Sequence, residues 1–169
     1  VRADGMAINP DELGDVHTEL DLWTGAVHAS YTLSGERVTV TTTADPDRHR
    51  FAVRVTSALL VRGWGVAWIF DEQKDDLADF EEPLEYSTSW ERHSVGHWTG
   101  RRQVEATDYV VDLFSSDRLV PLGTHAAMAA TNESTVDLVV ALGPGTDGVF
   151  DGPGFDELIA AASAWWERY

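Results

Sequence analysis

The chain has 169 residues, 43% of them hydrophobic, which is enough for one domain with a sizeable core. Its formal net charge is −17, with 29 acidic against 12 basic residues, so nucleic acid and anionic membrane surfaces are expected to repel it. Because the chain has no cysteine, disulfides, thiolate catalysis and cysteine-based metal sites are excluded.

The first part of the chain predicts a loose lead-in followed by an antiparallel meander. Residues 1–16 are polar and turn-rich. In AVHASYTL, 26–33, the side chains alternate in the period of a strand with one buried face. Ser34-Gly35 then indicates a hairpin turn in which glycine supplies a positive φ. Two further strands, ERVTVTTTA at 36–44 and HRFAVRVTSA at 49–58, complete the meander.

The middle of the chain predicts more strands around a long acidic loop. WGVAWIF, 64–70, is typical of a strand, and residues 71–85 are rich in Asp and Glu. Later strands are expected near 86–93, 103–105, 109–114, 123–130 and 135–142. Many short strands at regular spacing favour an antiparallel β-sandwich, which we assign to residues 17–145.

The last segment predicts a Gly-rich linker and one amphipathic helix, together residues 146–169. Apolar residues recur at helical spacing in FDELIAAASAWWERY: Phe155, Leu158, Ile159, Ala162, Trp165, Trp166 and Tyr169. Asp156 and Glu157 fall in the first turn, where acidic side chains complement the helix dipole.

Two segments resemble a known family. ELDLWTGAVHASYTLSGERVTVTTTADPDRHRFAVRVTS, 19–57, looks like the opening of the N-terminal β-sandwich, of the supersandwich type, in bacterial glycoside hydrolases and phosphorylases with an (α/α) toroid catalytic domain. The closing helix, 155–169, is similar to the linker helix that joins sandwich to toroid in those proteins. The resemblance covers about a third of the chain and contains no invariant motif.

The resemblance implies a non-catalytic domain that shapes one wall of an active-site cleft and in some members helps to form a dimer. Catalytic carboxylates of that family lie in the toroid, so no residue here inherits a catalytic role and no cofactor is expected. The expected partners are carbohydrate through the parent enzyme, an absent C-terminal catalytic domain and, in a homodimer, a second copy of the chain. Because no apolar run of about 18 residues and no signal-peptide pattern is visible, we expect no membrane span, and the compartment stays open between bacterial cytoplasm and secretion.

Histidine and acidic clusters are the candidate polar sites. The acidic loop, with Asp75, Asp76, Asp79, Glu81 and Glu82, offers oxygen ligands for calcium but lacks the spacing of a calcium loop, so we expect a solvated loop.

A second polar candidate is His93-Ser94-Val95-Gly96-His97-Trp98, in which the two imidazoles can lie on one side of a strand. A structural role is the first interpretation, contact with sugar or another domain the second, and a metal site with His125 or Asp108 the third; no metal site is assigned.

Tryptophans are the other candidates, seven in all. Trp64 and Trp68 share one face of a strand, which favours core packing. Trp90 and Trp98 lie near turns, where indoles can stack on sugar rings or contact another domain. Trp165, Trp166 and Tyr169 are predicted to dock the helix between domains: neighbouring helix positions point about 100° apart, so both indoles cannot face one sheet.

Two other functions remain open. A free-standing carbohydrate-binding module would show an exposed aromatic platform. A small aldose-epimerase-like enzyme would need a convergent set of histidine and carboxylate side chains in a cleft.

Overall fold

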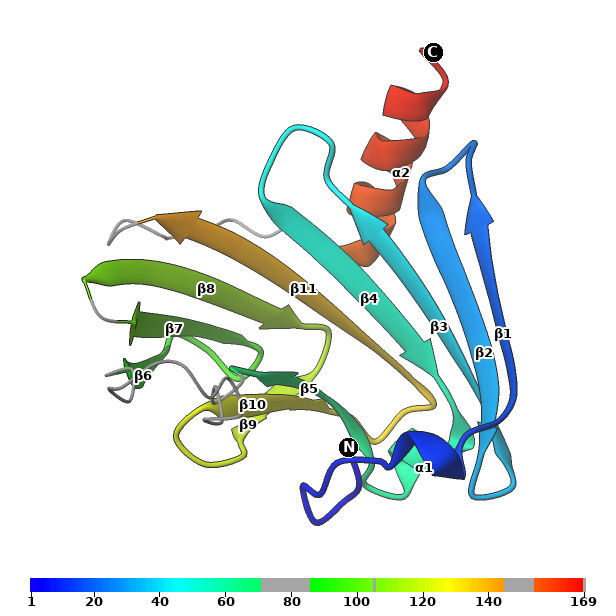
Figure 1. The fold of residues 1–169 in the computed structure, drawn as a ribbon, viewed down its shortest axis with the longest axis horizontal. Helices are drawn as coiled ribbons and strands as arrows, with labels where there is room; N and C mark the ends of the chain where they lie inside the picture. The colour runs from blue at the N-terminus through cyan, green and yellow to red at the C-terminus, as the bar shows by residue number, and fades with distance from the viewer. Residues whose placement is uncertain (71–85, 105, 145–153, 169) are drawn as a thin grey trace, which may run out of the picture.

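The computed structural model describes residues 1–70, 86–104, 106–144 and 154–168 and confirms the predicted all-β class. Two antiparallel sheets pack on each other, and one long helix lies at the C-terminal end (Figure 1). The acidic loop at 71–85, most of the Gly-rich linker and Tyr169 lie outside the described residues. No described helix is long and apolar enough to cross a membrane.

The larger sheet has eight strands. From one edge to the other they are β1 (Gly14–Asp21), β2 (Ala26–Leu33), β3 (Glu36–Ala44), β4 (Arg50–Thr56), β11 (Thr135–Pro144), β8 (Thr107–Ser115), β7 (His97–Val104) and β6 (Tyr86–Arg92). The meander predicted from the hairpin signals is therefore present as β2-β3-β4, and all pairs are antiparallel.

The smaller sheet has three strands, in the order β5 (Gly65–Ile69), β10 (Ala126–Ala130) and β9 (Arg118–Pro121). There are also two short helices: η1 (Pro10–Glu12) precedes β1 of the large sheet, and α1 (Ala58–Val61) connects β4 to β5 of the small sheet. The first residue of the predicted lead-in is bound to the small sheet: the Val1 amine donates a hydrogen bond of 2.8 Å to the Gly65 carbonyl of β5.

The core lies between the two sheets because side chains alternate along each strand. Val53 and Val55 of β4 point inward, whereas Ala52 and Arg54 point to the opposite face. The buried members of the core are Leu33, Val38, Val55, Leu59, Leu60, Phe70, Trp98, Val111, Leu113, Leu119, Ala127, Ala129, Val136, Leu138 and Val140. Trp64 and Trp68 pack against this cluster, as expected.

The C-terminal helix α2 (Phe155–Trp166) packs on the outer face of the large sheet. Its side chains Phe155 and Leu158 form a second apolar cluster with sheet residues Ala52 and Val139. The N-terminal half of the helix is therefore anchored to the sheet.

An ionic contact reinforces this anchor. The guanidinium of Arg54 binds both carboxylate oxygens of Asp137 (2.7 and 2.8 Å) and reaches Asp156 of α2 at 2.9 Å. These contacts raise the pKa of Arg54, and its guanidinium also lies over the Phe155 ring at 4.3 Å. One side chain of β4 thus ties the first turn of the helix to the sheet.

Three elements differ from the sequence-based expectations. β1 and β9 were not predicted, because β1 has no buried side chain and β9 is only four residues long. β7 begins at His97, well before the predicted 103–105. Gly100 lies inside β7, where the Trp90 ring takes the space of a side chain: a Cβ there would lie 2.6 Å from Trp90 Cζ3.

Candidate functional site

Two histidines, a threonine and an aspartate form a polar cluster on the outer face of the large sheet. His97 and Thr99 project outward from β7, while Trp98 between them points into the core. On the neighbouring β8, Val111 and Leu113 point inward and Asp112 points outward. His93 joins from the turn between β6 and β7. Strand alternation therefore builds this cluster from residues on three segments.

Hydrogen bonds connect the cluster through the threonine. Thr99 Oγ1 lies 2.8 Å from His93 Nε2 and donates to Asp112 Oδ1. Thr99 is 1% exposed and Asp112 is 4% exposed, so the carboxylate is held away from solvent. A buried carboxylate requires such partners, which explains the hydroxyl beside it.

His97 lies beside this chain of hydrogen bonds. Its ring is 4.5 Å from the His93 ring and stacks on Phe114 at 4.0 Å. Its Nε2 is 3.7 Å from Asp112 Oδ1, which is too long for a hydrogen bond, and it makes none within the described part of the chain.

The electrostatics favour a neutral imidazole at His97. Burial is the main cause that lowers the pKa of His97, and the neighbouring His93 lowers it further. The carboxylate of Asp112 opposes this shift. A neutral imidazole near pH 7 can accept or donate a proton, so this residue has the properties of an acid–base group.

A pocket of about 430 Å³ opens beside His97. It lies between the β6–β7 turn, the end of β8 and the first residues of α2. The polar side chains that line it are Ser94, His97, Ser115, Ser116, Asp117 and Asp137. Hydroxyls, carboxylates and an imidazole above an apolar floor of Phe114 and Phe155 suit a small polyol.

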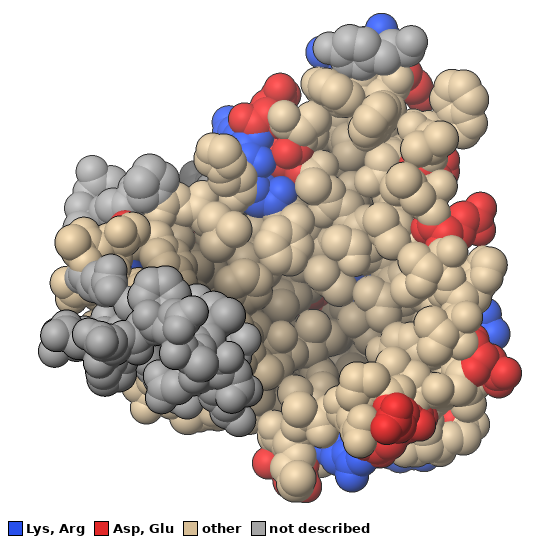
Figure 2. All heavy atoms as spheres, viewed as in Figure 1, with Lys and Arg blue, Asp and Glu red and all other residues tan. Residues whose placement is uncertain are grey.

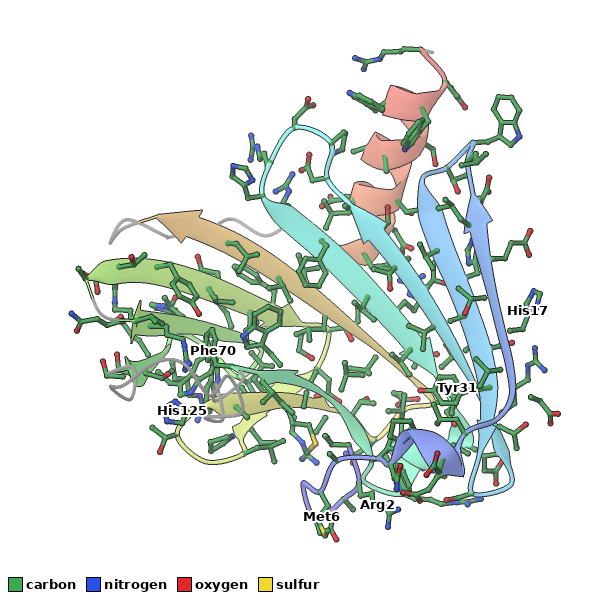
Figure 3. The ribbon with its side chains drawn as sticks, viewed as in Figure 1. Arg2, Met6, His17, Tyr31, Phe70 and His125 are labelled. Atoms are coloured by element: carbon green, nitrogen blue, oxygen red, sulfur yellow. The ribbon has the colours of Figure 1, made fainter. Side chains whose placement is uncertain are left out.

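The cluster does not resemble a metal centre. Among the described residues, no three His, Asp or Glu side chains converge as ligands. His125 lies instead against Thr88, with 2.8 Å between Nδ1 and the hydroxyl, near Phe70 on the small-sheet side of the large sheet (Figure 3). Asp108 pairs with Gln103 at the far end of β7 and β8. Neither residue is available to the two histidines as a third ligand.

The structure separates the candidate tryptophans from the candidate histidines. Trp98 is 8% exposed, and Trp90 packs against it and Phe70 with ring centroids 6.3 and 5.5 Å apart. The indole N–H of Trp90 donates to the Thr124 carbonyl over 3.0 Å. Both rings lie on the inner face, opposite His93 and His97, so a sugar contact through all four residues would need two separate sites. Carbohydrate or interdomain contact by these residues stays a prediction.

A second surface lies where the C-terminal end of α2 meets the β1–β2 turn (Figure 1). Leu22 is 65% exposed, Trp23 82% and Trp166 41%; we call these three residues the aromatic rim. The Trp166 ring packs against Gly25, and Trp165 is half-buried with its ring 5.0 Å from that of Trp166. The two neighbouring indoles therefore differ in exposure, and their docking on another domain stays a prediction.

Similarity to known proteins is found at the level of structure. No protein-family model matches the chain, and no curated protein sequence does. Among solved structures, 95% of the chain aligns with a family GH92 alpha-mannosidase from Bacteroides thetaiotaomicron, with 14% sequence identity and a TM-score of 0.39. The chain spans 24% of the length of that mannosidase. Similarity this low does not carry a function from one protein to the other.

Proposed function

We propose that this chain is a non-catalytic β-sandwich domain of a carbohydrate-active enzyme, a glycoside hydrolase or phosphorylase, and that its aromatic rim packs against a neighbouring domain. The family resemblance of residues 19–57 and 155–169 suggests that this neighbour is an (α/α) toroid. Carbohydrate would then reach the chain only through the parent enzyme, with the sandwich forming one wall of the cleft.

Exposure of the aromatic rim is the observation that supports this proposal most. Burying a large apolar side chain contributes roughly 1.5–3 kcal/mol to folding or binding. Trp23 is 82% exposed, so most of this stabilisation is absent in the isolated chain. Exposed apolar surface of this kind commonly marks an interface. The rim also lies at the end of a helix whose other half is fixed to the sheet by Phe155 and Leu158, which would hold the rim in a defined position.

Activity and association of the isolated chain test the proposal. The chain is incubated with a panel of aryl glycosides and disaccharides, with and without inorganic phosphate, and we expect no release of product. Sedimentation velocity should show weak, concentration-dependent association that Trp23→Ser removes. Val95→Ser is the matched control, because Val95 is 56% exposed but lies in the β6–β7 turn. Glycoside turnover, or retention on a polysaccharide gel that Trp23→Ser abolishes, would contradict the proposal.

A small aldose-epimerase-like enzyme is the second candidate. It is favoured by one observation: a half-buried His97 and the buried Asp112 lie 3.7 Å apart beside a polar pocket. Polarimetry of freshly dissolved aldohexoses would show accelerated mutarotation, lost in His97→Gln and retained in His17→Gln, a histidine exposed on β1. Equal rates with and without protein would reject this candidate.

A further inference from the structure

The strand β5 forms one end of the small sheet, and its backbone orientation can be assigned residue by residue. All five of its residues pair with β10. In an antiparallel pair, successive residues direct their N–H and C=O groups alternately toward and away from the neighbour. The Phe70 N–H donates to the His125 carbonyl, on the β10 side. Trp68 and Val66, two and four positions earlier, share the direction of Phe70. The alternate residues Gly65, Ala67 and Ile69 therefore direct their backbone groups away from β10.

The first residue of the chain already uses this outer edge. The Val1 amine donates to the Gly65 carbonyl over 2.8 Å, and the Gly65 N–H donates to the Val1 carbonyl over 3.1 Å. Such a reciprocal pair is the hydrogen-bonded pair of an antiparallel ladder. Next along the edge, Ala67 and Ile69 have no backbone partner among the described residues. Within the described residues, the ladder on this edge therefore consists of the Val1–Gly65 pair, and the positions of Ala67 and Ile69 are unpaired.

An apolar groove of about 270 Å³ lies beneath this edge. β5 and α1 form one side of the groove, and the inner face of β2, β3 and β4 forms its floor. The floor includes Tyr31, Leu33, Val40, Val53 and Val55. No described side chain that lines the groove is charged. Figure 2 shows a hollow bordered mostly by residues without charge, with the acidic groups toward the periphery, and Figure 3 labels Tyr31 on β2, one of the residues that line the groove.

We propose that β5 accepts an extended segment of a partner polypeptide as a fourth strand of the small sheet. The segment runs antiparallel to β5, in the register of the Val1–Gly65 pair, and exchanges backbone hydrogen bonds with Ala67 and Ile69. Addition of a strand to an exposed sheet edge is a general mode of peptide recognition. The edge of β5 carries no charged side chain that would repel such a strand.

The register also defines which side chains the partner needs. Residues directly opposite each other on paired strands share a face of the sheet. Val66 and Trp68 point toward the large sheet and pack on the core, so the partner residues opposite them enter the apolar groove. These two positions of the partner require apolar side chains. The positions opposite Ala67 and Ile69 lie on the other face of the sheet and accept polar side chains. The proposal concerns a surface on β5 and does not depend on the aromatic rim at the β1–β2 turn.

A labelled peptide tests the proposal. The probe is an acetylated segment of six residues in which valine and threonine alternate, followed by two glutamates for solubility and a fluorophore. We expect saturable binding by fluorescence polarisation. Ala67→Pro removes the outward N–H while leaving the hydrogen bonds to β10, so it should weaken binding at least tenfold. Ala67→Val keeps the N–H and is the matched control.

Hydrogen exchange measured by NMR gives a second readout that needs no variant. In the chain without peptide, the amides of Ala67 and Ile69 should exchange much faster than those of Val66 and Trp68, which bond to β10. Added peptide should slow the first pair selectively. The proposal is overturned if the four amides are equally protected without peptide, if no binding occurs at millimolar peptide, or if a peptide N-methylated on its edge-facing amides binds equally well.

Discussion

Substituting Gly25 tests how the aromatic end of α2 is held against the β1–β2 turn. Gly25 has φ +65°, and a Cβ built on it would lie 2.1 Å from Trp166 Nε1. Gly35 in the β2–β3 turn has φ +79°, and a Cβ there would meet nothing within 4 Å. Gly25→Ala and Gly35→Ala therefore form a matched pair: both place a side chain at positive φ, and only the first displaces Trp166.

The two costs can be estimated separately. A residue other than glycine at positive φ costs roughly 1–2 kcal/mol of folding free energy, and this applies to both variants. Trp166 is 41% exposed, so displacing it loses about half of the roughly 1.5–3 kcal/mol that full burial of a large side chain contributes. We expect Gly25→Ala to lower the free energy of unfolding by about 1 kcal/mol more than Gly35→Ala.

Urea denaturation of a double-mutant cycle measures this difference. In a Trp166→Ala background the ring is absent, so Gly25→Ala and Gly35→Ala should cost the same. Equal costs in the wild-type background, or an excess that persists without the Trp166 ring, would refute the contact between the helix end and the turn.

Three further predictions follow from the charges. Arg54→Gln should lower the free energy of unfolding by about 1–3 kcal/mol, because Asp137 and Asp156 lose charged hydrogen bonds, and urea denaturation checks this. The control is Arg62→Gln: the Arg62 side chain, paired with Glu36, is 58% exposed, so its loss should cost about 1 kcal/mol or less. The folded pKa of His97 lies below its unfolded value near 6.5, so its contribution to stability is present above pH 6.5 and is lost as the pH falls below that value. His97→Gln should therefore flatten the decline in melting temperature between pH 6.5 and 5, and an unchanged slope would contradict this prediction. At a net charge of −17, moderate sodium chloride should raise the melting temperature, and calcium chloride should do no more at equal ionic strength; a saturable shift at micromolar calcium would contradict this.

The sequence predicted the fold best where each strand has one buried face. β2 and β3 begin and end where their alternation and hairpin turn indicate, because the same pattern directs both burial and register. β1 gives no such signal: its Val16 and Leu20 are exposed, and pairing with β2 fixes it in place. Strands held by neighbours rather than by their own buried face are not visible in a local pattern.

The candidate site was only partly predictable for the same reason. His93 and His97 were selected by their spacing, and the structure places their rings 4.5 Å apart. Thr99 and Asp112 were not selected, although an aspartate in the apolar run YVVDLF was an available signal. That signal has meaning only once β7 and β8 are paired, because pairing brings Thr99 opposite Asp112.

The mass of the native polypeptide that carries this chain tests the proposed function most directly. An antibody raised against the chain, which alone is 18.6 kDa, would be used on extracts of its native cells, and the recovered protein would be assayed for glycoside turnover. A domain of a carbohydrate-active enzyme predicts a polypeptide larger by several hundred residues that hydrolyses or phosphorolyses a glycoside, while the isolated chain does neither. A native product of about the mass of the isolated chain, or a larger one without glycoside turnover, would contradict the proposal.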